Sequence, residues 1–130
     1  MLKSAKLYIS VILALVMAPI ALIAQENDML RYMAIPLMDG LTENSEGSML
    51  FDTPGGRIIY AEASGTNAAK DVHKYYNMAL PSLEWSVDQS ASCDPSLAFC
   101  INATRGTENL LLDISVMVNK TIINYSLMPN

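Results

Sequence analysis

The side chains of this chain that could do chemistry are two cysteines, one histidine and the carboxylates. Cys93 and Cys100 are separated by Asp-Pro-Ser-Leu-Ala-Phe. A redox pair usually has the spacing Cys-x-x-Cys, and a zinc site needs more ligands than these cysteines and His73 provide. We therefore expect a structural disulfide, with a redox pair or a metal site as the alternatives. Closing so short a loop contributes about 2.5 kcal/mol in the chain-entropy treatment.

His73 is the only histidine, so any histidine-based catalysis depends on it. Its neighbours on a helix would be Lys70, Asp71, Lys74 and Asn77, a set that favours an exposed helix face. A hydrolase would pair His73 with a serine or an aspartate, but the chain has no Gly-x-Ser-x-Gly nucleophile motif. A small hydrolase that uses His73 stays the alternative, and we assign no catalytic residue.

Three carboxylates, Asp52, Glu62 and Asp113, lie in segments predicted to be strands. Strand alternation turns Asp113 away from Leu112 and Ile114, toward the solvent face of the sheet. Glu62 is likewise turned away from Ala61 and Ala63, and we therefore interpret Glu62 and Asp113 as solvated strand residues rather than as an acid–base pair. The sequence also lacks a calcium-binding loop pattern, and we expect no metal site and no cofactor.

Aromatic side chains supply flat apolar surface with a polar edge, and they can therefore line a ligand pocket. Tyr76, Trp85, Phe99 and Tyr125 fall where a predicted helix meets predicted strands. They form our candidate binding site for a small ligand or lipid, in a cavity between helix and sheet. Core packing under the helix is the commoner reason for such residues.

Residues 1–24 have the three parts of an export signal. Lys3 and Lys6 make the start positive, Leu7 to Ile23 are uncharged and largely apolar, and Ala24 is a small residue suited to processing. We predict a cleaved signal peptide over residues 1–24 and a periplasmic or secreted protein. The alternative is an uncleaved membrane anchor, because the apolar run is near the lower limit for a membrane span.

The composition changes once this leader is set aside. The whole chain of 130 residues is 52% hydrophobic and carries a net charge of -5, from 8 basic and 13 acidic side chains. Without Lys3 and Lys6 the balance is 6 basic against 13 acidic side chains, a charge of −7. So acidic a domain is a poor nucleic-acid binder, because neutralising phosphates requires clustered basic residues. The length supports one domain.

Hydrophobic patterning predicts the elements that position these side chains. Residues 25–48 mix Pro, Gly and acidic residues with apolar ones, so we expect an irregular segment that lies partly across the domain surface. Two β-prone runs, 49–52 and 57–63, surround a Pro-Gly-Gly turn and predict a hairpin.

Apolar residues at helical spacing predict one main helix over residues 67–80. Thr66 or Asn67 can cap its start, and Pro81 marks its end or a kink in its last turn. Trp85 then begins a short alternating run that predicts a strand against the helix.

The last third of the chain predicts an antiparallel meander of three strands. A loop at 105–108 would pair Ala103 with Leu110. A turn at Asn119-Lys120 would pair Val118 with Thr121 and Ile114 with Tyr125, which keeps the apolar residues on one side. We therefore predict an α+β domain over residues 49–130, in which an antiparallel sheet, made of the hairpin and the meander, packs against the single helix.

The string Tyr75-Tyr76, Leu80-Pro81 and Leu83-Glu84-Trp85 resembles a pattern in small exported bacterial proteins of unassigned function. In those proteins a helix with Phe-Tyr ends at Leu-Pro-x-Leu-Gly-Trp and leads into a β meander. The resemblance spans roughly residues 36–128 and includes the hairpin before the helix. It implies the α+β fold and export, but no catalytic residue. Glu84 stands where that pattern usually has Gly.

These observations favour a non-enzymatic exported domain that acts by contact with another protein of the cell envelope. Missing catalytic motifs, an acidic surface and sheet edges available for pairing support this hypothesis. The alternative is the ligand-binding or lipid-binding module with the aromatic cavity. We expect no nucleic-acid partner, and membrane contact only through residues 1–24 if they are retained.

Overall fold

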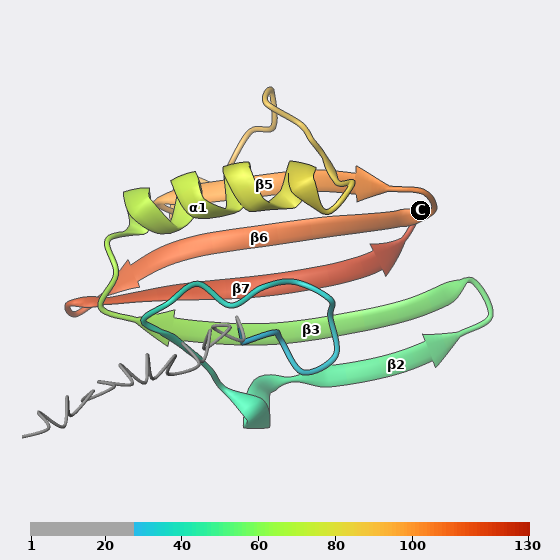
Figure 1. Cartoon of the computed structure of the whole chain (residues 1–130), viewed down its shortest axis with the longest axis horizontal. Coiled ribbons are helices and arrows are strands. Elements are labelled where there is room, and N and C mark those ends of the chain that lie inside the picture. The colour runs from blue at the N-terminus through green and yellow to red at the C-terminus, as the bar shows by residue number, and fades with distance from the viewer. Residues whose placement is uncertain (1–27) are drawn as a thin grey trace, which may run out of the picture.

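The computed structural model describes residues 28–130, and they form one antiparallel seven-stranded sheet with one main helix lying on it (Figure 1). The predicted α+β fold is confirmed. The leader predicted over residues 1–24 lies outside the described residues. The elements, in chain order, are β1 (Leu41–Glu43), the short 3-10 helix η1 (Ser45–Gly47), β2 (Met49–Thr53), β3 (Gly56–Gly65), α1 (Ala69–Ser82), β4 (Ser86–Val87), β5 (Phe99–Arg105), β6 (Glu108–Met117) and β7 (Lys120–Pro129).

The sheet has the strand order β1-β3-β7-β6-β5-β4, and β2 also pairs with β3. Because β7 occupies one edge of β3, β1 and β2 both lie along the other edge. The predicted β2–β3 hairpin is confirmed, with Phe51 opposite Ile58. Gly56 has a φ of 137°, and a Cβ there would approach Pro129 to 3.1 Å, so the turn requires glycine.

The meander formed as predicted, but one register differs. Ala103 pairs with Leu110, as expected. The β6–β7 turn lies at Val118-Asn119 rather than at Asn119-Lys120, and Ile114 therefore pairs with Ile123 instead of Tyr125. Val118 and Asn119 both have positive φ, 39° and 61°, as a two-residue turn of the I′ type requires. The shift is two residues, so every apolar side chain keeps its face.

Helix α1 begins and ends two residues later than the predicted range of 67–80. Val72, Tyr76 and Leu80 form its buried stripe. The predicted side-chain cap is wrong, because the N-cap is Ala68, which has no capping side chain. Asn67 instead donates from Nδ2 to the carbonyl oxygen of Asp39, at 2.9 Å.

A Schellman motif ends α1 just after Pro81. The Trp85 amide donates to the Leu80 carbonyl at 3.1 Å, and the Glu84 amide donates to the Pro81 carbonyl at 3.1 Å. Glu84 has a φ of 68°, the left-handed conformation that this motif places just after the helix. Glycine adopts that conformation at the least cost.

The segment expected to be irregular covers half of the sheet. We call residues 28–40 the strap; it crosses the side of the sheet that carries α1, in front of β7 and β3 (Figure 1). Its apolar side chains are buried at Leu30, Met33, Ile35 and Leu37. The strap therefore belongs to the core rather than to the surface. Beyond it the segment forms β1 and η1.

Candidate functional site

Three of the four predicted site aromatics lie in the core. Tyr76, Trp85 and Tyr125 are buried, and Phe99 is half-buried. The hydroxyls of Tyr76 and Tyr125 lie 2.7 Å apart, and the Tyr76 hydroxyl also donates to the carbonyl oxygen of Pro36 at 2.9 Å. These bonds tie α1, β7 and the strap together inside the core. Side chains therefore occupy the space where the aromatic cavity was expected.

Burial raises the pKa of Tyr76 to about 12 and shifts the pKa of Tyr125 further in the same direction. The neutral form is favoured because an ionised phenol would lose its hydration in the core. Both hydroxyls therefore keep their protons at neutral pH. The pair is a structural link between elements.

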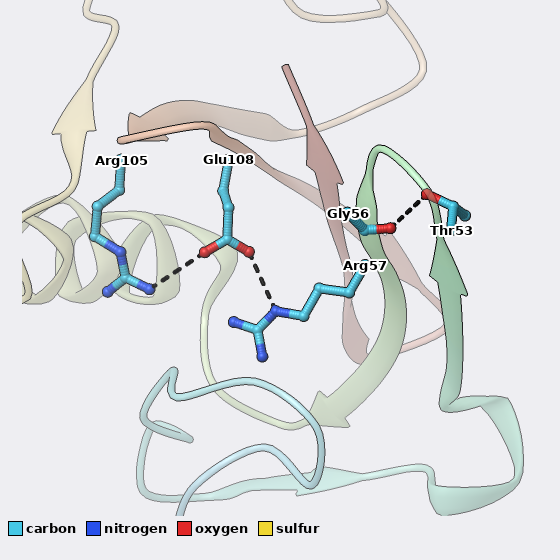
Figure 2. A network of polar contacts seen from close by, with 5 residues as sticks. All are labelled: Thr53, Gly56, Arg57, Arg105 and Glu108. Carbon is cyan, nitrogen blue, oxygen red and sulfur yellow. Dashed lines mark hydrogen bonds and ion pairs between the residues drawn. The ribbon is translucent and has the colours of Figure 1, made fainter.

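Trp85 packs at the other end of the helix, away from the tyrosine pair. The Arg105 guanidinium lies 4.3 Å from the centre of the Trp85 ring and donates to the Leu83 carbonyl at 3.1 Å. Glu108 bridges Arg105 and Arg57, at 3.9 and 3.2 Å (Figure 2). This network of partly exposed charges closes the side of the sheet where α1 ends, near the β2–β3 turn drawn in the same view.

His73 is half-buried rather than exposed, so the expectation of a solvated helix histidine was wrong. Its ring stacks on Phe99 with centroids 4.6 Å apart, and its Nε2 lies 3.0 Å from Asn77 Nδ2. Both residues border a small hollow of about 200 Å³ beside the loop over residues 88–98. The hydrogen bonds that the structure gives His73 involve neither a serine nor an aspartate, so no nucleophile–base pair is formed there.

The predicted disulfide is present. The Cys93 and Cys100 sulfurs are 2.00 Å apart and the Cα atoms are 5.6 Å apart. The bridge fastens the loop over residues 88–98 to β5. Asp94 in this loop accepts hydrogen bonds from the Ser96 hydroxyl and amide, which lower the pKa of that carboxyl.

The remaining candidate is the other side of the sheet. Figure 1 shows α1 and the strap on the same side, which we call the covered face. We call the opposite side the open face, because α1 and the strap leave it uncovered. The segment around η1 borders this face at Glu62, whose Oε1 accepts a hydrogen bond from Asn44 Nδ2 at 3.3 Å, and the loop over residues 88–98 borders it at Cys100. Apolar side chains form a band on the open face: Met49, Phe51, Ile58, Tyr60, Leu111 and Met128. Strand pairing aligns Met49 with Tyr60 and Phe51 with Ile58, whereas Leu111 lies opposite Ser126 and diagonal to Met128.

The side chains of this apolar band are unusually exposed for large apolar residues on a sheet. Met49 and Phe51 are each 49% exposed, and Tyr60 is 37% exposed. Ile58, Leu111 and Met128 are half-buried by their neighbours on the sheet. A contiguous apolar surface of this kind commonly marks an interaction site.

An acidic row runs beside the apolar band. Strand pairing aligns Glu62, Asn124, Asp113 and Cys100 across β3, β7, β6 and β5. Burial, and then the nearby Asp94 carboxylate, raise the pKa of Asp113. Most basic side chains of residues 28–130 lie elsewhere: Arg31 in the strap, Arg57 and Arg105 with Glu108, and Lys70 and Lys74 on α1. Lys120 begins β7 on the same side as Asn124, at the end of the sheet away from Asp113.

Two hollows indent the open face on either side of Asn102 and Leu111. The larger, about 520 Å³, also includes Asp88 and Met128, and the smaller, about 320 Å³, includes Asp94. The disulfide-bonded loop supplies Asp88 to one hollow and Asp94 to the other. Asn102 Oδ1 lies between them, buried and without a hydrogen-bond partner. The open face is thus concave, apolar and acidic.

No protein-family model, curated protein or solved structure matches this chain. No helix within residues 28–130 is both long and apolar enough to cross a membrane. Within the same residues, no group of three or more His, Cys, Asp or Glu side chains is arranged to hold a metal ion. Function is therefore inferred from the open face itself.

Proposed function

We propose that this protein is a non-enzymatic exported domain that binds another protein of the cell envelope through the open face. The carrying observation is the apolar band, which leaves Met49 and Phe51 half exposed on the face of the sheet that α1 and the strap do not cover. Leaving such a surface in water costs free energy, and a partner that covers it recovers that energy. The disulfide is compatible with an exported protein.

The geometry of His73 and the tyrosines supports binding rather than catalysis. The Tyr76 and Tyr125 hydroxyls have each other and Pro36 as partners, and the His73 ring is stacked on Phe99. Neither arrangement presents an activated group to a substrate. We therefore expect His73→Ala to leave partner binding unchanged.

Site-specific photo-crosslinking tests the proposal in intact cells. A photoreactive residue replaces Leu111 on the open face, and the matched control places it at Met78, which is 69% exposed on α1. We expect one discrete adduct with an envelope protein from position 111, none from position 78, and loss of the adduct when Phe51→Ser is added. A strictly monomeric protein with no adduct from position 49, 60 or 111 would overturn the proposal.

A further inference from the structure

We infer that the open face is built to receive a cationic amphipathic helix of its partner protein. This inference rests on the proposed function and adds the chemistry of the partner. Three properties of the open face carry it: the sign of its charge, the absence of free backbone groups in the middle of the sheet, and its concave shape.

The negative charge of the open face indicates that its partner is positively charged. Glu62 and Asp113 lie in the acidic row, and Asp88 and Asp94 border the two hollows. Strand alternation places Lys120 on the same side of β7 as Asn124, but four residues away at the beginning of the strand, beside Ser64. Arg57 and Arg105 are engaged with Glu108 on the covered face. Glu62, Asp94 and Asp113 therefore form no ion pair within residues 28–130, and lysine or arginine on a partner would supply one.

The same charge disfavours other occupants. Two copies docked face to face would bring two surfaces of the same negative charge together, with Glu62, Asp94 and Asp113 on each. Nucleic acids and anionic lipid headgroups carry the same sign and would also be repelled. A cationic protein segment is the occupant that the charge favours.

Backbone hydrogen bonding selects the secondary structure of that segment. In the middle of the sheet, β7 and β6 are paired on both sides, so their amides and carbonyls are already bonded. An extended peptide laid on this face would find no partners for its own backbone groups, whereas a helix satisfies them internally. Helix α1 already packs in this way on the covered face (Figure 1).

Shape places the contacts of the helix. The apolar band, with Leu111 and Met128 at the larger hollow, would receive an apolar stripe. Asp94 and Asp113 at the smaller hollow would receive basic side chains. Asn102, which borders both hollows, adds a polar side chain between these two groups of contacts.

Peptides of defined sequence test the inference with the purified, oxidised protein. The probe is a synthetic Leu/Lys amphipathic helix about 18 residues long. One control has Glu in place of Lys, and another has the same Leu/Lys composition in scrambled order, which removes the apolar stripe. We expect the Leu/Lys helix to bind at least tenfold more tightly than either control in titration calorimetry, and to bind more weakly as salt is raised.

Variants then map the contact. Leu111→Ser should weaken binding about tenfold, and Asp113→Asn about threefold, as expected for one partly exposed charge. Asp71→Asn on α1 removes the same charge away from the open face and should have no effect. In the double variant Asp94→Lys/Asp113→Lys the preference should reverse, so that the Leu/Glu helix binds more tightly. Thermal unfolding of each variant establishes that it is folded.

Several outcomes would overturn the inference. Equal binding of the scrambled peptide would indicate unspecific attraction of cations, and equal binding of the Leu/Glu helix would remove the role of charge. Concentration-dependent dimerisation that is abolished by Phe51→Ser would make a second copy the occupant. A crosslinked envelope partner with no binding of the Leu/Lys helix would leave the proposed function standing while refuting this inference. Peptide binding without any envelope partner would refute the proposed function instead.

Discussion

The two faces of the sheet are made from the same strands but have opposite surroundings. On β6, Leu110, Leu112 and Ile114 are buried under α1 and the strap. The residues between them, Leu111 and Asp113, are only half-buried on the open face. α1 and the strap close the centre of the covered face, although Leu50 and Val116 at its margins stay 44% and 57% exposed. The open face keeps an apolar band and carboxylates without such a cover. Stability therefore depends mainly on one face, and we propose that recognition depends on the other.

The largest expected effect comes from a matched pair of substitutions on β6. Leu112 is fully buried and Leu111 is its neighbour on the open face. We expect Leu112→Ala to lower the free energy of unfolding by about 2–5 kcal/mol, through lost burial and a residual cavity. Leu111→Ala should lower it by about 1 kcal/mol or less, while weakening partner binding. Urea denaturation measures the free energy of unfolding of both variants. Equal losses of stability would contradict the proposed difference between the two faces.

The disulfide affects both the stability of the fold and the shape of the open face, because it fastens to β5 the loop that borders the two hollows. Replacing both cysteines, as Cys93→Ser/Cys100→Ser, should lower the free energy of unfolding by about 2.5 kcal/mol. Binding of the cationic helix should also weaken, because Asp94 is then less well positioned. The wild-type protein under reducing conditions should behave in the same way, and the oxidised wild type is the reference. Unchanged binding would show that the loop is no part of the recognition surface.

Alkaline pH should lower the free energy of unfolding, because Tyr76 and Tyr125 are kept neutral in the core under the covered face. An exposed tyrosine ionises with a pKa of about 10, whereas the pKa of Tyr76 is raised to about 12. Between these values the unfolded state binds fewer protons than the folded state, so the free energy of unfolding falls as pH rises. The decline approaches about 1.4 kcal/mol per pH unit for each tyrosine kept neutral.

The double variant Tyr76→Phe/Tyr125→Phe is the control for this pH dependence. It is less stable at neutral pH, because the Pro36 carbonyl loses its hydroxyl donor. Its stability should nevertheless fall less steeply above pH 10 or so. Denaturation curves collected at several pH values give both slopes, and parallel slopes would show that other groups cause the decline.

Local patterns predicted the covered face better than they predicted the open one. Alternation and turn residues indicated the hairpin, and alternation together with the short loop at 105–108 indicated the Ala103–Leu110 register. The predicted β6–β7 register was wrong by two residues. The alternation of apolar and polar residues determines which face each side chain occupies, but it does not determine at which residues the turn lies. A positive φ at Val118, a β-branched residue, contradicts local preference.

The strap and the open face were missed for a different reason. Apolar residues at 30, 33, 35 and 37 have no strict period, since the strap follows the contour of the sheet rather than a helix or strand. The open-face band joins β2 to β7, which are distant in the sequence, so it becomes visible only once the strands are paired. The available signal was Met49, Phe51, Tyr60 and Leu111 at strand positions where polar residues are usual.

The smallest expected effect separates stability from recognition. Glu84 holds a left-handed conformation at the end of α1, with a φ of 68°, and a side chain there costs about 1 kcal/mol. Glu84→Gly should therefore raise the free energy of unfolding by up to about 1 kcal/mol, part of which is offset by the greater freedom of glycine in the unfolded chain. Glu84→Ala, which removes the charge but keeps the Cβ, is the control and should give no such gain. Glu84 lies beyond α1 on the covered side, so binding of the cationic helix should stay unchanged in both variants. A change in binding would show that the helix end communicates with the open face, and the two faces could then no longer be treated as independent.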